Sequence, residues 1–70
     1  MHIGRGAKAA RILAGLDQAD LADRLGMTRQ AVSDAELRTS WRVGTLEKYA
    51  DALGFSTSEI LLLAKMAKDV

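Results

Sequence analysis

The chain of 70 residues has no cysteine and no proline, and it contains one tryptophan, one tyrosine and one phenylalanine. Without cysteine it can form neither a disulfide framework nor a thiolate metal site, which fits a reducing cytoplasmic setting. No apolar run approaches the roughly 18 residues of a membrane span, and residues 1–15 lack the apolar region of a signal peptide. We therefore expect a cytoplasmic protein with no membrane partner.

Chemically reactive side chains are also scarce. The sequence has one histidine and no glycine-rich phosphate loop, so it offers no nucleophile–base pair and no metal-binding cluster. The acids at positions 17, 20 and 23 fit the solvated first turn of a helix. We predict that the protein is not an enzyme and has no catalytic residue, no cofactor and no metal ion.

Apolar residues make up 49% of the chain and recur at helical spacing, with little alternation. This pattern predicts an all-α fold, a compact five-helix bundle forming a single domain over residues 1–70. The helices are expected over residues 5–14, 18–25, 29–36, 43–53 and 57–68. A domain of this size buries only about 60% of its unfolded surface, so a partner subunit covering further apolar surface would be expected.

Three junctions share one pattern, in Gly15-Leu16-Asp17, Gly26-Met27-Thr28 and Gly54-Phe55-Ser56. The glycine can close a helix in the left-handed conformation, the apolar residue can pack against the next helix, and the polar residue can cap that helix. These junctions predict the helix boundaries.

The first helix is expected to pack through small side chains. Its predicted inward stripe is Ala7, Ala10, Leu13 and Ala14. Gly4 and Gly6 weaken the start of this helix, so we expect a frayed first turn. We expect His2 to be a flexible terminal residue.

The central stretch Gln18–Glu36 reads QADLADRLGMTRQAVSDAE and divides at Gly26 into two short amphipathic helices. Two helices held at a set angle by a short turn containing glycine form a helix-turn-helix. The net charge of +1 does not by itself announce nucleic-acid binding, and residues 17–36 carry five acids against two arginines. The flanking segments, with Arg5, Lys8 and Arg11 before the motif, would have to supply the attraction to phosphates.

The motif extends into a wider pattern. Its members are Gly15-Leu16-Asp17-Gln18, Leu21-Ala22, Leu25-Gly26, Thr28-Arg29, Val32-Ser33, Glu36, Thr45-Leu46, Tyr49-Ala50 and Ala52-Leu53-Gly54. Over residues 8–62 this pattern resembles the Cro/repressor-type (xenobiotic-response-element) helix-turn-helix family. The resemblance implies a lambda-repressor-like bundle that binds double-stranded operator DNA, usually as a homodimer on a two-fold site. The stretch from Arg42 to Leu46, with Tyr49, is also similar to the antitoxin branch of the family, whose members repress their own operons.

The resemblance implies that the second helix of the motif enters the major groove. Arg29, Gln30 and Ser33 would then read bases, with Arg29 donating to guanine O6 and N7 and Gln30 pairing with adenine. The alternative is that these are ordinary solvated helix residues.

Contacts to the DNA backbone are expected at the start of the motif and in the loop that follows it. The expected residues are Gln18, Thr28, Arg38, Thr39, Ser40 and Arg42. Such contacts position the protein without reading sequence, and a solvated loop is the alternative for each loop residue.

Three further residues have open roles. Asp34 could accept a hydrogen bond from cytosine N4, pair with an arginine or face water, and the last two are favoured because an acid near phosphates is costly. Glu36 is expected to be structural, tied to neighbouring backbone or to an arginine. Trp41 is expected to plug the core or an interface rather than stack on bases.

The last helix carries more apolar residues than one face can hold, and such surplus indicates an interface. The expected homodimer contacts are Ile60, Leu62, Leu63, Met66 and Ala67. The sequence thus predicts a homodimeric repressor acting on a palindromic operator, which could be its own promoter. The alternative is a protein-binding module, such as an antitoxin or a small inhibitor of another regulator, that neutralises its partner through this helix.

Overall fold

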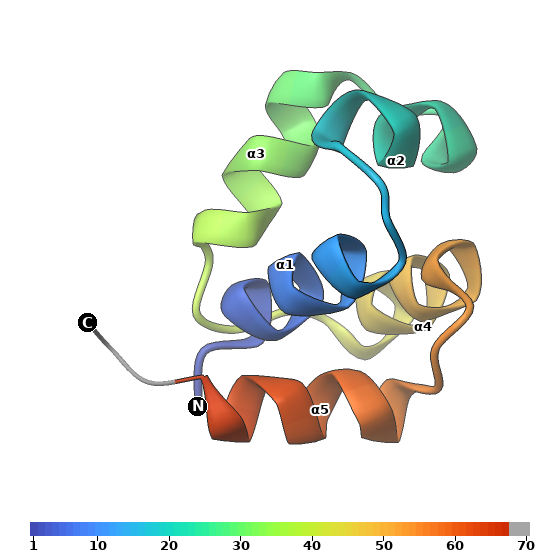
Figure 1. Ribbon diagram of the computed structural model, residues 1–70. Helices are drawn as coiled ribbons and strands as arrows, with labels where there is room; N and C mark the ends of the chain where they lie inside the picture. The colour runs from blue at the N-terminus through green and yellow to red at the C-terminus, as the bar shows by residue number, and fades with distance from the viewer. Residues whose placement is uncertain (68–70) are drawn as a thin grey trace.

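The computed structural model describes residues 1–67, and this part of the chain forms α-helices without strands. The elements are α1 (Ile3–Leu13), α2 (Gln18–Leu25), α3 (Arg29–Leu37), α4 (Val43–Leu53) and α5 (Thr57–Met66). Figure 1 shows α1 between α5 on one side and the α2–α3 pair on the other. The predicted all-α bundle of five helices is confirmed for the described residues.

The helix bounds differ from those expected only at some ends. α2 and α4 span the expected residues, and α3 is one residue longer. α1 begins at Ile3 rather than at residue 5 and ends at Leu13. α5 ends at Met66 because Ala67 adopts an extended backbone, and the expected end at Lys68 lies outside the described residues.

The junctions follow the pattern of glycine, apolar residue and cap. Gly15, Gly26 and Gly54 have φ values of 73°, 66° and 75°, the left-handed region that closes a helix without a Cβ clash. The cap side chains each accept a hydrogen bond from the backbone N–H three residues on, in α2, α3 and α5. In α2 and α5 the acid at that third position also accepts from the cap's own N–H, which completes a capping box.

The core lies between the helices, with α1 packed against α3, α4 and α5, and α2 packed against α3 and α4. Its largest fully buried side chains are Tyr49, Leu21, Ile60 and Val32. Ile60 was expected at a dimer interface, and the structure corrects this, because Ile60 has 0% of its surface exposed and faces inward from α5.

The start of α1 is more ordered than expected. His2 caps the helix, since its Nδ1 accepts a hydrogen bond from the Arg5 N–H at 3.0 Å, so it is not a free terminal residue. Gly4 and Gly6 are buried, and they allow close packing rather than fraying. A Cβ on Gly6 would lie 2.6 Å from Ala64 Cβ of α5, and a Cβ on Gly4 would clash with the Glu36 carbonyl.

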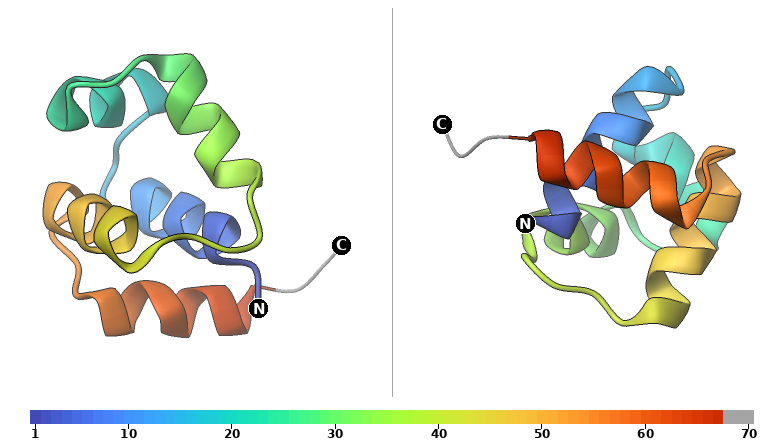
Figure 2. Two further views of the ribbon diagram at one scale, coloured as in Figure 1. Left: turned by 180° about the vertical axis from the view of Figure 1, so that it is seen from behind. Right: turned by 90° about the horizontal axis from the view of Figure 1, so that it is seen from below.

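The inward stripe of α1 is correct at Ala7 and Ala10, which are fully buried, and wrong at Leu13 and Ala14. These last two residues are exposed, because the helix ends at Leu13 and the chain turns away at Gly15. Figure 2 shows that the other end of α1, at the N-terminus, lies beside the end of α5. No helix within residues 1–67 has the length and apolar character needed to cross a membrane.

Candidate nucleic-acid interface

The second helix of the motif, α3, turns one face inward and the other outward. Val32 and Glu36 are buried, whereas Arg29 and Gln30 are exposed and Ser33 is half-buried. Thr28 caps the helix by accepting from the Ala31 N–H at 3.1 Å. The backbone N–H groups in the first turn of a helix have no hydrogen-bond partner within the helix. The exposed first turn of α3 is therefore suited to binding electron-rich groups.

Four of the predicted site residues meet in one hollow. Gln18 from the start of α2 and Arg29, Gln30 and Ser33 from α3 line a cavity of about 430 Å³. Gln18, which is predicted to contact a DNA phosphate, therefore lies next to the residues predicted to read bases. One surface could thus contact base edges in a groove and the phosphate beside that groove.

Gln18 is held in place by a buried ion pair. Its Nε2 donates to Glu36 Oε1 at 3.0 Å, and Arg11 donates to the same carboxylate through Nε at 2.6 Å and Nη2 at 3.1 Å. Arg11 Nη1 also donates to the Leu16 carbonyl at 3.0 Å. The expected structural role of Glu36, paired with an arginine, is confirmed, and this network joins α1, α2 and α3.

The partner of Glu36 was missed in the sequence, where Arg11 counted only as part of a basic segment. Arg11 stands on the buried face of α1 beside Ala7 and Ala10, and a charge on such a face needs a buried partner. That position was the available signal.

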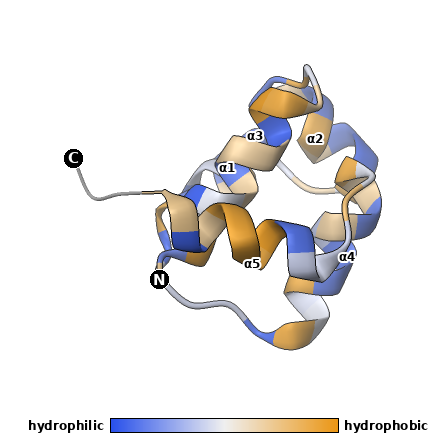
Figure 3. Cartoon of the chain, turned by 60° about the horizontal axis from the view of Figure 1, so that its bottom comes forward, coloured by the Kyte–Doolittle hydropathy of each residue, from blue (hydrophilic) through white to orange (hydrophobic). Residues whose placement is uncertain are grey.

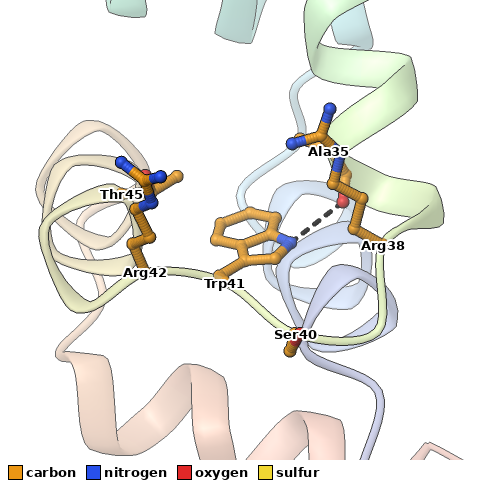
Figure 4. Close-up of a pocket in the computed structure, with 6 residues that line it drawn as sticks. All are labelled: Ala35, Arg38, Ser40, Trp41, Arg42 and Thr45. Carbon is orange, nitrogen blue, oxygen red and sulfur yellow. Dashed lines mark hydrogen bonds between the residues drawn. The ribbon is translucent and has the colours of Figure 1, made fainter.

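The loop after α3 forms a second hollow, drawn in Figure 4, of about 540 Å³. Trp41 is one of the residues that line it; its indole Nε1 donates to the Ala35 carbonyl at 3.0 Å, and its ring meets Tyr49 edge-on with centroids 4.4 Å apart. The predicted packing role of Trp41 is confirmed. Arg38 and Arg42 lie on either side of the indole with their guanidinium groups on the same side of the loop.

The loop backbone is anchored to the start of α1. The Ile3 N–H donates to the Thr39 carbonyl at 2.8 Å and the Gly4 N–H donates to the Arg38 carbonyl at 3.0 Å. These bonds satisfy N–H groups that the helix itself leaves free. The side chains of Arg38, Thr39, Ser40 and Arg42 stay exposed, and in Figure 4 Ser40 lies apart from the two guanidinium groups.

Two basic side chains of α1, Arg5 and Lys8, lie next to the helix-turn-helix, and neither was among the predicted site residues. Arg5 and Lys8 line a hollow of about 470 Å³ together with Gln18 and Ser33. Basic side chains therefore flank α3 on the side of α1 as well as on the side of the loop, and they offset the acids of the motif.

The acids of the motif have local partners. The Asp20 backbone N–H donates to Asp17 and lowers the pKa of that carboxyl below its ordinary value. Asp34 is exposed to water, which was one of the two favoured alternatives, and it also accepts a hydrogen bond from Gln30 Nε2 at 3.0 Å, a partner that was not expected.

A helix-turn-helix whose second helix shows a polar outer face between two groups of cations defines a DNA-binding module. In agreement, a family model described as helix-turn-helix matches residues 8–60. The chain belongs to this family, the Cro/xenobiotic-response-element type, and is a DNA-binding regulator rather than a member of a catalytic family. No solved structure matches the chain.

Proposed function

We propose that this protein is a cytoplasmic, sequence-specific repressor that binds a palindromic operator as a homodimer, with its own promoter as the first candidate target. In each half-site Arg29, Gln30 and Ser33 of α3 read base edges in the major groove. Phosphates on either side are held by Gln18 and Thr28 at the start of the motif, and by Arg38, Thr39, Ser40 and Arg42 in the loop.

The observation that carries this proposal is the shared hollow of Gln18, Arg29, Gln30 and Ser33. It brings a guanidinium and two amides, the groups that bind guanine and adenine edges and phosphates, to one exposed surface. The second hollow, between Arg38 and Arg42, offers a further phosphate contact at the far end of α3.

The dimer is proposed to form through α5. Leu62 and Met66 stand one turn apart on its outer face, 57% and 65% exposed, and Leu63 and Ala67 are half-buried beside them. Figure 3 shows that much of α5 consists of hydrophobic residues. For a palindromic operator, the dimer must place its two α3 helices one turn of DNA apart, about 34–36 Å.

The proposal is tested by mobility shift and footprinting on the DNA upstream of the coding sequence. We expect salt-sensitive binding to an imperfect palindrome, with affinity of about 10⁻⁸ M or tighter. Gln30→Ala should reduce that binding toward the level seen with random DNA. Ser58→Ala, an exposed polar residue of α5, is the control and should bind as wild type; equal affinity of the wild-type protein for random DNA would refute sequence specificity.

The dimer surface is tested separately. Deleting α5 would remove the buried Ile60 and unfold the core, so point substitutions are needed. Leu62→Lys with Met66→Lys should give a folded monomer at micromolar concentration in analytical ultracentrifugation. Leu13→Lys, which changes an equally exposed leucine of α1, should leave the dimer intact. A double variant that remains dimeric would show that the interface lies elsewhere.

The same two side chains support a second candidate, in which α5 binds another protein such as a toxin or a regulator. An exposed apolar pair serves either partner. Purification from the native host distinguishes them, because a stoichiometric second protein that is lost in the Leu62→Lys, Met66→Lys variant favours this candidate.

A further inference from the structure

The outer face of α3 carries one acid, and it is bonded to a proposed base-reading residue. Gln30 Nε2 donates to Asp34 Oδ1 at 3.0 Å, with both side chains exposed and one helical turn apart. Asp34 is exposed and follows Gln30 by one turn, so its carboxylate lies beside a residue proposed to read bases.

We propose that Asp34 is a positioning residue that fixes the side-chain amide of Gln30 in the orientation that selects adenine and rejects guanine. This inference rests on the proposed function, since it assigns a base preference to the same helix. Asp34 would act through Gln30 and need not contact DNA itself.

The chemistry of the pair supports this assignment. An ionised carboxylate only accepts hydrogen bonds, so the amide must turn its nitrogen, not its oxygen, toward Asp34. One of the two Nε2 hydrogens is then engaged. The amide has one N–H and the Oε1 lone pairs left for a ligand.

That remaining pair, one donor and one acceptor, matches adenine, which presents N7 as an acceptor and the N6 amine as a donor. Guanine presents two acceptors, N7 and O6. A free glutamine could meet guanine by turning both of its N–H groups toward it, but Gln30 bonded to Asp34 cannot. The negative charge of Asp34 adds repulsion toward the electron-rich guanine edge.

An acid on this face also changes the affinity for DNA and the discrimination between bases. Asp34 repels phosphates and so lowers affinity for every DNA sequence, while the Gln30 bond raises the difference between right and wrong bases. Specificity is a difference of affinities and can be gained by penalising the wrong ligand. Asp34 thus weakens overall binding and sharpens discrimination.

The test is selection from a randomised duplex pool with the full chain, followed by titration of matched duplexes. Gln30→Ala identifies the base pair that Gln30 reads, as the position where the preference disappears. Wild-type protein is then titrated with duplexes carrying adenine or guanine at that position, at one salt concentration, beside Asp34→Ala and Asp34→Asn. Asp51→Ala removes an exposed acid of α4 and controls for the change in charge.

We expect the wild-type protein to prefer adenine by at least about five-fold, the lower end for one bidentate contact. Asp34→Ala should bind all duplexes more tightly and lose most of that preference. Asp34→Asn should keep more of it, because the asparagine oxygen can still accept from Gln30. Asp51→Ala should leave the ratio unchanged, and circular dichroism should show that each variant is folded.

The inference is overturned if Asp34→Ala keeps the wild-type ratio, if its preference changes at a different base pair, or if the position read by Gln30 prefers a base other than adenine. A wild-type pool that yields no consensus overturns the proposed function itself, and the two failures are thereby distinguished.

Discussion

The ion pair between Arg11 and Glu36 gives the sharpest prediction for stability. Replacing Glu36 by alanine removes the acceptor of two hydrogen bonds from Arg11 and one from Gln18. The side chains of the pair are only 10% and 4% exposed, so water cannot replace the lost carboxylate without a change in packing. The guanidinium is left buried with the Leu16 carbonyl as its remaining bonded partner.

The size of the effect follows from burial. Breaking a buried pair by removing one partner costs about 3–5 kcal/mol, because an uncompensated charge stays inside. At roughly 0.05–0.15 kcal/mol per residue, a domain of 70 residues has a total stability of about 4–10 kcal/mol. Each kcal/mol shifts Tm by about 4–8 °C in a domain of this size, so Glu36→Ala should lower Tm by about 12 °C or more.

The assay is thermal and urea unfolding followed by circular dichroism at neutral pH. Glu47→Ala removes an exposed acid of α4 and should change the free energy of unfolding by less than about 0.5 kcal/mol. The double variant Arg11→Met, Glu36→Met should be more stable than Glu36→Ala, because it leaves no unpaired charge. A loss below about 1 kcal/mol in Glu36→Ala, or a double variant no better than the single one, would refute this reasoning.

Three other predictions concern packing, pH and salt. Gly6→Ala should destabilise the domain by about 1–3 kcal/mol, because the added Cβ would clash with α5. Gly44→Ala should stabilise it by about 0.5–1 kcal/mol, because the added Cβ meets nothing within 4 Å. Thermal melts that rank the two variants in the opposite order would contradict the packing described for Gly6. The pKa of Asp17 is lowered in the folded protein, so the stability that this carboxylate contributes is present at neutral pH and is lost as the pH falls below the ordinary pKa of 3.8. The Tm of Asp17→Asn should therefore decline less than the Tm of the wild type between about pH 5 and about pH 2. Parallel declines would argue against the capping role of the carboxylate. If Arg42 contacts one phosphate, Arg42→Ala should reduce the magnitude of the slope of log affinity against log salt concentration by about 0.9. Fluorescence anisotropy titrations measure this slope, and an unchanged slope would show that Arg42 does not contact DNA.

Local chemistry explains why much of the fold could be predicted. Helix ends depend on residues within one turn, so the cap Asp17 and Gly26 were enough to predict the bounds of α2, and Gly54 was enough to predict the end of α4. The length of α5 was overestimated, because the apolar residues continue to Ala67 while the helical backbone ends at Met66. The exposed and buried sides of α3 followed from helical periodicity in the same way.

What could not be predicted depends on contacts between elements. Gly4 and Gly6 look like helix breakers until α3 and α5 are seen against them. Ile60 and Leu62 are alike in sequence, and only the direction of α5 makes one a core residue and the other a surface residue. The bond between Gln30 and Asp34 was missed because the acid was considered only with DNA, arginine or water as partner.

α1 lies outside the helix-turn-helix, yet it holds both Gln18 and the loop after α3, which carry most of the proposed phosphate contacts. Its first N–H groups hold the loop carbonyls at Arg38 and Thr39, and its Arg11 holds the carboxylate that binds Gln18. Both anchors come from one rigid helix, so a shift of α1 would move the two ends of the DNA-facing surface together. Substitutions in α1 that do not touch DNA should therefore weaken binding to all sequences alike, because they displace the backbone contacts on which α3 depends for its register.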